Sequence, residues 1–600
     1  MSAAVSQVLP LFGTAPAPTA PARAAAPSPA AVGALVATGR VEVVATRREA
    51  CVAARLRSRD VRRGFVLVAA LALAQIVHLG IAGGGKRSLS MDEALLPERG
   101  DIVDHSGVPL ARAFPAYALW FNPHALGDGP ALVKSPAEVA AALVAIFPDE
   151  NLARLTQRLA SGQGGYLRRR ILPEEANRIH AIGEPALEFP RETERFYPQG
   201  TMAAHVLGYV DAAGHGQVGM EQVLNQRLRD ASMRGTPAML SLDARVQGAL
   251  EDELARGMGE TQARGAGGIV LDVETGEVLA LASLPSFNPN LIDRAGAANI
   301  FNRMTNQVYE LGSVFKPLTV ATAIDAGTVA DMARRYPAGA EREVAHHVVH
   351  DHKNFGASLN IPEALIHSSN IVLAQIGDEL GGARLQATMQ ALGMNHRPSI
   401  ELPAKGAPLW PHGPWSSVTT STVAYGHGLS VTPLHVASAY AALVNGGVWH
   451  PATLRKIAPG EQVPGRRIWQ AATSARMRQL LRVIVKVGTG RTADAAGYRV
   501  GGKTGTAEVA DKAGYHKDRV VTTFAAAFPM DRPRYVVLVT MDEPHANQAT
   551  SFQRTAAWNA APVVGRVVPR IGPLLGIMPD ASRDIDISDI APLIASGEGE

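Results

Sequence analysis

The sequence predicts an α+β protein of more than one domain, whose larger domain is an antiparallel sheet covered by helices. The chain has 600 residues, which is too long for a single hydrophobic core. Apolar strand patterns near residues 268–282 and 520–540 enclose a long Ala-rich helical stretch, which is typical of a sheet with inserted helices. Short strands and helices alternate before them, over residues 98–235, and predict a smaller α+β domain.

The N-terminal segment predicts a membrane anchor. Residues 1–63 begin with an Ala- and Pro-rich stretch of very low charge and end in a block of arginines. Residues 64–82, GFVLVAALALAQIVHLGIA, contain no charged side chain and approach the ~20 residues that cross a bilayer. A buried core helix is the alternative, in view of Gln75 and His78, and a cleaved signal peptide is disfavoured by the long basic region. Because arginines precede it, we expect a retained single-pass transmembrane helix in the inner membrane, with a cytoplasmic N-terminus and a periplasmic catalytic domain.

Composition narrows the class of protein. Apolar residues make up 46% of the chain and charged residues 19%, as in a globular protein. The formal net charge of +4 is small for this length, which argues against a nucleic-acid partner. The single cysteine, Cys51, excludes an intramolecular disulfide but does not exclude export from the cytoplasm.

The first folded domain, a pedestal between the anchor and the larger domain, is expected over residues 83–235. Residues 98–111 contain two short strand patterns joined by a Ser-Gly turn. Helical patterns follow at 136–147 and 150–160, and Gly219 begins another. This alternation predicts an α+β domain.

The second domain is expected over residues 236–580. Its predicted elements, in chain order, are a helix from Ala244 to about Met258, a hairpin with strands 268–273 and 278–282, Ala-rich helices, and strands 520–528 and 535–540. Residues 581–600 are acidic and are expected to form a loose C-terminal tail.

The stretch ELGSVFKP, residues 310–317, carries the first candidate catalytic pair. The run from Ser313 predicts an apolar helix with Pro317 in its first turn, where a missing N–H costs little. Ser313 and Lys316 are three residues apart, so on a helix their side chains can meet. A serine needs a base to take its proton, and a lysine amine is a credible base when burial or another cation lowers its pKa. Alone this signal is weak, because a serine at a helix start is usually an N-cap.

The second motif is one of three Ser-x-Asn matches. Ser286 and Asn288 lie in a proline-flanked loop, and Asn360, two residues after Ser358, is typical of a helix cap. The third pair, Ser368 and Asn370, places consecutive polar residues inside an apolar helical pattern. Such a polar cluster needs partners, which a cleft supplies, so Ser368 and Asn370 are the candidates.

The third motif is Lys503-Thr504-Gly505-Thr506, which contains the single Lys-Thr-Gly of the chain. One interpretation is a glycine-rich turn beside a strand. The functional interpretation is a strand edge whose small residues admit a substrate backbone, while Lys503 adds positive charge. Each motif alone is at the level of chance, whereas the three together, in this order, are strong evidence for a catalytic domain.

The ordered set Ser-x-x-Lys, Ser-x-Asn and Lys-Thr-Gly is that of β-lactamases and penicillin-binding proteins. The chain resembles a class B penicillin-binding protein over most of its length after the anchor, in the stretches RGDIVDHSGVPLA, RFYPQGTMAAHVLGYV, GQVGMEQ, YELGSVFKP, IHSSNIVLAQIG, AYGHGLSVTPLH, GTGRTADAAGYRVGGKTGTAE and VVLVTMDEP. IHSSN, HGLSVTPLH and MDEP are most similar to the septal, cell-division member, and the elongation-specific member is the alternative. One departure is Leu311, where many relatives have proline.

The resemblance implies the penicillin-binding-protein transpeptidase fold and a D,D-transpeptidase that cross-links peptidoglycan. Ser313 would attack the D-Ala–D-Ala carbonyl of a stem peptide, and β-lactams would acylate the same serine. Lys316 would accept the Ser313 proton. Ser368 would relay a proton to the leaving group, and Asn370 would hold Lys316 and the substrate amide. Lys503 would lower the Lys316 pKa because both side chains carry positive charge. Thr504 and Thr506 would bind the terminal carboxylate, and the N–H groups of Ser313 and Thr506 would form the oxyanion hole.

The resemblance also implies partners and excludes some alternatives. Because no glycosyltransferase module is recognised before the second domain, we expect a separate lipid-II glycosyltransferase and other divisome proteins as partners. The rivals are a β-lactamase or D,D-carboxypeptidase, a β-lactam sensor, and a scaffold without catalysis, for which the three motifs would be incomplete. No cofactor or metal is expected, although His346, His347, His350, Asp351 and His352 could be interpreted as a metal site.

Overall fold

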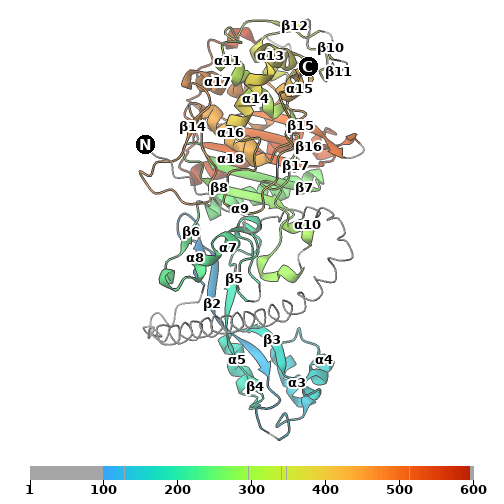
Figure 1. Cartoon of the computed structure of the whole chain (residues 1–600), viewed down its shortest axis with the longest axis vertical. Helices are drawn as coiled ribbons and strands as arrows, with labels where there is room; N and C mark the ends of the chain where they lie inside the picture. Colours follow the sequence, from blue (N-terminus) through green and yellow to red (C-terminus); the bar gives the residue numbers. More distant parts are fainter. Residues whose placement is uncertain are drawn as a thin grey trace, which may run out of the picture. The chain divides into compact units, whose positions relative to one another are not determined.

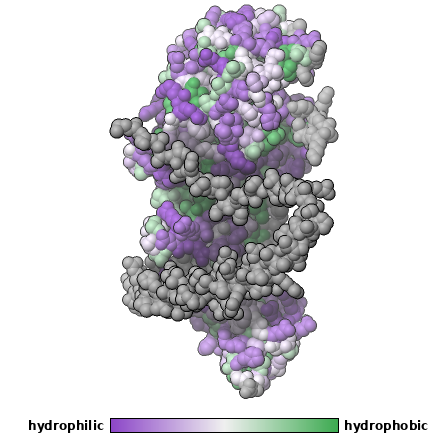
Figure 2. Space-filling model, in the orientation of Figure 1, coloured by the Kyte–Doolittle hydropathy of each residue, from purple (hydrophilic) through white to green (hydrophobic). Residues whose placement is uncertain are grey.

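The computed structural model describes residues 99–594, apart from residues 128, 212, 295, 340, 346 and 512–513. The expected anchor, residues 64–82, and the segment before it lie outside the described residues. Among the residues that are described, no helix combines the length and the apolar character that a bilayer span requires. Figure 2 shows a described surface in which hydrophilic residues predominate and hydrophobic residues occur in small groups.

The pedestal contains one sheet, in the order β3-β2-β1-β6, with β4 and β5 also paired to β2. The strands are β1 (Ile102–Val103), β2 (Pro109–Phe121), β3 (Gly165–Ile171), β4 (Leu187–Glu188), β5 (Arg191–Phe196) and β6 (Ala238–Met239). The predicted hairpin at residues 98–111 is present as β1 and the start of β2, which are antiparallel. β6 pairs in parallel with β1, so the chain leaves this sheet three to four residues beyond the expected boundary at 235.

Helices accompany these strands in the pedestal. They are α3 (Pro136–Ile146), α4 (Leu152–Ala160), α5 (Pro173–His180), α6 (Ala204–Leu207), α7 (Gly219–Val223) and α8 (Asn225–Arg229). α3 begins at Ser135, whose hydroxyl accepts from the Glu138 N–H while the Glu138 carboxylate accepts from the Ser135 N–H. This capping box satisfies two backbone donors that a helix start leaves unpaired. The predicted helices at 136–147 and 150–160 are therefore confirmed, and α7 begins at Gly219 as expected.

The second domain is built on a five-stranded antiparallel sheet in the order β15-β16-β17-β7-β8 (Figure 1). The strands are β7 (Gly265–Asp272), β8 (Val278–Leu284), β15 (Gly501–Asp511), β16 (Gly514–Phe528) and β17 (Tyr535–Asp542). Both predicted strand pairs are confirmed, and β17 beside β7 joins strands that are far apart in the sequence. β15, which carries Lys503, lies at the edge of the sheet.

Helices cover both faces of this sheet because its side chains alternate. Ile269, Ala525 and Leu538 point into the larger core, whereas their neighbours Val270 and Phe524 point into the core beneath α9 (Ala244–Thr261) and α18 (Ala560–Leu574). The larger core holds α11 (Lys316–Asp325), α12 (Ile361–Ile366), α13 (Asn370–Leu380), α14 (Gly382–Ala391), α15 (Ser417–Tyr425), α16 (Pro433–Val444) and α17 (Ala471–Val487).

Small elements complete the domain: α10 (Ala297–Ile300), β9 (Tyr336–Pro337) with β12 (Ser358–Leu359), β10 (Arg342–Val344) with β11 (His347–Val349), and β13 (Val448–Trp449) with β14 (Arg466–Arg467). The predicted antiparallel sheet covered by helices is confirmed.

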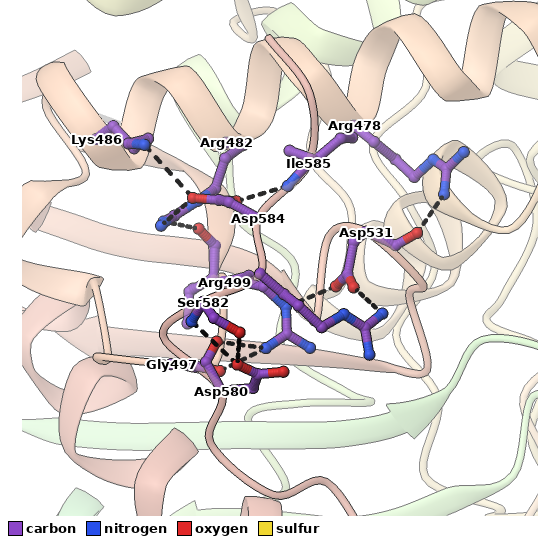
Figure 3. A network of polar contacts seen from close by, with 12 residues as sticks. Arg478, Arg482, Lys486, Gly497, Arg499, Asp531, Asp580, Ser582, Asp584 and Ile585 are labelled. Carbon is purple, nitrogen blue, oxygen red and sulfur yellow. Dashed lines mark hydrogen bonds and ion pairs between the residues drawn. The ribbon is translucent and has the colours of Figure 1, made fainter.

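The C-terminal segment corrects one expectation. Residues 580–594 are not a loose tail, because Arg482 of α17 binds Asp584 at 2.9 Å and Asp494 at 2.8 Å. In Figure 3, Asp580 and Asp584 lie against α17 and the segment before β15. Ile590 is 1% exposed, so apolar contact adds to the ion pairs. An acidic composition suggested solvation, but Asp584 and Asp589 each pair with an arginine of α17, Arg482 and Arg476.

Candidate active site

Ser313 lies in a tight turn that precedes a helix. Gly312–Phe315 form a 3-10 turn, and α11 begins at Lys316, so the predicted helix starts three residues later than expected. Gly312 has a φ of +60°, which ends the preceding segment and starts the turn. Pro317 falls in the first turn of α11, as the sequence predicted. Ser313 is partly exposed, whereas Lys316 is fully buried.

Two glycines outside this turn allow its backbone to sit where it does. A Cβ at Gly426 would lie 1.8 Å from the Gly312 carbonyl oxygen, and a Cβ at Gly505 would lie 2.3 Å from the Leu311 carbonyl oxygen. The Gly312 N–H also donates to the Gly426 carbonyl at 3.1 Å. Backbone contact on both sides therefore fixes the position of Ser313.

The Lys316 amine is enclosed by acceptors from the second motif. It donates to the Asn370 Oδ1 at 2.7 Å, to the Ser368 hydroxyl at 3.1 Å and to the Ser368 carbonyl. Burial lowers the pKa of Lys316 well below its ordinary value, and the positive charge of Lys503 lowers it further, while Asp351 acts in the opposite direction. A buried amine with a depressed pKa can exist without its proton, as a general base must.

Lys503 approaches the same serine from β15. Its amine lies 3.0 Å from the Ser368 hydroxyl, 3.0 Å from the Thr504 carbonyl and 3.1 Å from the Thr504 hydroxyl. The side chain is fully buried, which lowers its pKa to about 7. The Ser368 hydroxyl thus bridges the amines of Lys316 and Lys503, and the three predicted motifs meet at one point.

Ser368 is held in an unusual backbone conformation. Its φ is +60°, in the left-handed region that a non-glycine residue rarely adopts. This residue separates α12 from α13, so the predicted break in an apolar helix is confirmed. Asn360 caps α12 by accepting from the Glu363 N–H at 3.0 Å, as the sequence also predicted.

The Thr504, Gly505 and Thr506 segment forms part of β15, which within the described residues pairs with β16 alone. The Thr504 hydroxyl lies 2.8 Å from that of Thr489, and the Thr506 hydroxyl accepts from the Ala556 N–H at 3.1 Å. A strand edge without a sheet partner can pair with an extended peptide, so this edge can hold a substrate backbone.

Comparisons with known proteins agree with this geometry. The family model described as "Penicillin binding protein transpeptidase domain" matches residues 266–562, and that described as "Penicillin-binding Protein dimerisation domain" matches residues 94–236. A protein of Caulobacter vibrioides, named "Probable peptidoglycan D,D-transpeptidase FtsI", is 39% identical over 80% of this chain and 82% of its own length. The chain belongs to the class B penicillin-binding proteins.

Two further likenesses extend the comparison. "Peptidoglycan D,D-transpeptidase FtsI" of Escherichia coli K12 is 27% identical over 86% of this chain and 90% of that protein. Among solved structures, penicillin-binding protein 3 of Mycobacterium tuberculosis complexed with ampicillin is 25% identical, with a TM-score of 0.63 over 82% of this chain and 98% of that chain. The domain that carries the three motifs follows the dimerisation domain, since the two family matches cover residues 266–562 and 94–236.

The structure of this penicillin-binding protein also shows site residues that sequence reasoning missed. Asp351 accepts from the Ser369 hydroxyl at 2.6 Å and from the Ile371 N–H at 3.2 Å, and so caps α13 beside Asn370. In the sequence, Asp351 belonged to a histidine-rich cluster interpreted as a possible metal site. Its position 19 residues before Asn370 carries no signal for such a contact. Thr489 and Gly426 are likewise close to the site only through the fold.

Proposed function

We propose that this protein is a peptidoglycan D,D-transpeptidase that cross-links stem peptides through a Ser313 acyl-enzyme during septal wall synthesis. The observation that carries the proposal is the pair of buried amines, Lys316 and Lys503, that share the Ser368 hydroxyl, with Lys316 three residues after Ser313. A nucleophile, a base with a lowered pKa and a second hydroxyl for proton relay are what acyl transfer requires. Penicillin and other β-lactams acylate the same serine.

The first half-reaction consumes the D-Ala–D-Ala bond. Neutral Lys316 takes the Ser313 proton as the hydroxyl oxygen bonds to the carbonyl carbon of the penultimate D-Ala. The oxyanion is held by the N–H groups of Ser313 and Thr506, each worth about 3–4 kcal/mol in such sites. As the peptide bond breaks, Ser368 passes a proton from Lys316 to the leaving D-Ala nitrogen. Asn370 orients Lys316 and the substrate amide, and Lys503, Thr504 and Thr506 bind the terminal carboxylate.

The second half-reaction forms the cross-link. An amine of a neighbouring stem peptide attacks the acyl carbon, loses a proton to the same relay, and displaces the Ser313 oxygen, which regains its proton. Gly505 admits the substrate backbone close to β15. No redox change and no nucleotide is involved, so this chemistry suits a compartment without ATP.

The septal assignment rests on the IHSSN, HGLSVTPLH and MDEP stretches and on relatives named FtsI. An elongation-specific transpeptidase is the alternative. We further propose that residues 64–82 anchor the protein in the inner membrane, that residues 83–235 form a pedestal and 236–580 the transpeptidase domain, and that a lipid-II glycosyltransferase and other divisome proteins are its partners.

Intact mass of the full-length protein after incubation with benzylpenicillin tests the proposed nucleophile. A long-lived penicilloyl adduct is expected on the wild type, none on Ser313→Ala, and an undiminished adduct on the control Ser286→Ala, whose serine lies in another Ser-x-Asn pair. Rapid turnover of the drug without an adduct would indicate a β-lactamase. Neither adduct nor turnover would favour a scaffold without catalysis.

A further inference from the structure

A cavity of the second domain lies outside the site formed by the three motifs. It has a volume of about 490 Å³, within the range of ~300–1,000 Å³ that is usual for sites of small molecules. The end of α14 and the loop after it, residues 392–399, form one wall, while α16 and the β13–β14 hairpin complete the others. No residue of the three motifs lines it.

Three polar side chains that line this cavity have unused hydrogen-bonding groups. Ser438 of α16 is 5% exposed, and its hydroxyl makes no hydrogen bond to any described residue. The indole N–H of Trp449 and the amide oxygen of Asn395 are buried and also lack a hydrogen bond. A buried polar atom without a partner lowers stability, so a ligand that bonds to these groups would gain binding free energy.

The chemistry of these three groups indicates a hydroxylated ligand. The Trp449 indole can only donate, the Asn395 oxygen can only accept, and the Ser438 hydroxyl can do both. A ligand that satisfies all three must therefore offer donors and acceptors, as the hydroxyl groups around a sugar ring do. Leu392 and Leu434 also line the cavity, and the C–H groups of such a ring can pack against them.

The charge of the cavity favours an anion. Arg397 and Arg466 line it, whereas no acidic side chain does so among the residues that the structure describes, and neither arginine forms an ion pair with any of those residues. Each arginine donates to a backbone carbonyl, so its positive charge is not neutralised by a carboxylate. The Arg466 guanidinium also lies 5.0 Å from the centre of the Trp449 ring, beside the unpaired indole. His435 adds no charge, because burial lowers its pKa to about 4.

We propose that this cavity binds an acidic sugar, a hydroxylated ring that carries a carboxylate or a phosphate. Arg397 and Arg466 bind the anionic group. The hydroxyl groups bind to Asn395, Ser438 and Trp449. Carboxylate and phosphate share one recognition chemistry here, because a planar guanidinium can donate two parallel N–H groups to either. The site takes no part in the proposed acyl transfer.

Four probes test the assignment on the full-length protein: glucose, glucuronic acid, glucose 6-phosphate and inorganic phosphate. A ligand-observed NMR titration gives the dissociation constant of each. We expect about millimolar dissociation constants for the two acidic sugars, which have few non-hydrogen atoms, and at least ~10-fold weaker binding for glucose and for inorganic phosphate. The tighter of the two acidic sugars then shows whether the site prefers a carboxylate or a phosphate.

Matched variants connect the binding to particular side chains. Arg397→Gln combined with Arg466→Gln should weaken binding of the acidic sugars ~10-fold or more. Arg467→Gln is the control and should change it by less than about twofold, since this neighbour in β14 does not line the cavity. Trp449→Phe keeps a ring but loses the N–H, and Ser438→Ala loses the hydroxyl, so each should weaken binding ~3- to 10-fold. A cooperative thermal unfolding transition shows that each variant is folded.

Glucose that binds as tightly as the acidic sugars would overturn the assignment of an anion, and inorganic phosphate that binds as tightly would overturn the assignment of a sugar. Failure of both acidic sugars to bind at about 20 mM, or equal binding by the wild type and the double arginine variant, would overturn the site itself. The titrations involve no acylation, so their failure and a failure of the proposed function are distinguishable.

Discussion

The substitution Gly426→Ala tests whether backbone packing behind Ser313 sets the reaction rate. Gly426 has a φ of +101°, where a Cβ costs ~1–2 kcal/mol in any protein. The added Cβ would also lie 1.8 Å from the Gly312 carbonyl oxygen, so the nucleophile turn must move. Such overpacking adds ~1–3 kcal/mol to the loss of stability. A displacement near 1 Å at a reacting group costs ~100-fold in rate.

Gly356→Ala is the matched control. Gly356 has a φ of +103°, but nothing lies within 4 Å of a Cβ there. It therefore carries the same conformational cost without the steric one. The assays are the second-order rate of benzylpenicillin acylation and the free energy of unfolding. We expect Gly426→Ala to lose ~100-fold in rate and Gly356→Ala less than about threefold. Equal acylation rates in the two variants would refute the argument that this contact positions Ser313.

Three further predictions concern charge. Lys503→Met removes a positive charge that lowers the Lys316 pKa, so the Lys316 pKa should rise. The acidic limb of the pH profile of acylation should then move to higher pH. An unmoved limb would contradict an effect of Lys503 on the Lys316 pKa. Asp351→Asn removes a charge that raises the Lys316 pKa, so the same limb should move to lower pH, and the lost cap of α13 should cost ~1 kcal/mol of stability by thermal unfolding. Asp584→Ala removes one of the two carboxylates that bind the buried Arg482, so it should lower the free energy of unfolding by ~1–3 kcal/mol. Asp586→Ala is the control and should change the free energy of unfolding by less than ~0.5 kcal/mol, because Asp586 is exposed and makes a local turn contact. Equal losses in the two variants would contradict a stabilising role of the Arg482–Asp584 pair.

Sequence reasoning found the groups that meet at the candidate site because each leaves a local signature. Ser313 and Lys316 have helical spacing, Ser368 and Asn370 interrupt an apolar pattern, and Lys503 follows two glycines in a strand pattern. The strand pairs were found for the same reason, since apolar runs between turn residues are local features. Fold class could thus be predicted together with these groups.

What the sequence could not predict depends on distant contacts. The start of α11 at Lys316 follows from Gly312, whose backbone is fixed against Gly426 more than a hundred residues away. The ordered C-terminal segment requires the guanidinium of Arg482, which no local pattern around Asp584 indicates. The cap that Asp351 places on α13 likewise depends on the loop that returns it there.

The two buried amines explain how this site can hold a base before substrate arrives. The Lys316 and Lys503 amines both lie within 3.1 Å of the Ser368 hydroxyl oxygen, and both lysine side chains are fully buried. Two full positive charges at this separation repel each other strongly at the dielectric of a buried site, so the pair titrates as a unit and favours a state with one proton fewer. Burial lowers the pKa of Lys316 and the positive charge of Lys503 lowers it further, and Lys316 is also the amine three residues from Ser313. In the proposed reaction, the substrate carboxylate neutralises the charge that stays on Lys503, and Ser368 connects the base to the leaving group. The burial of the two amines around Ser368 therefore supports the proposed activation of Ser313.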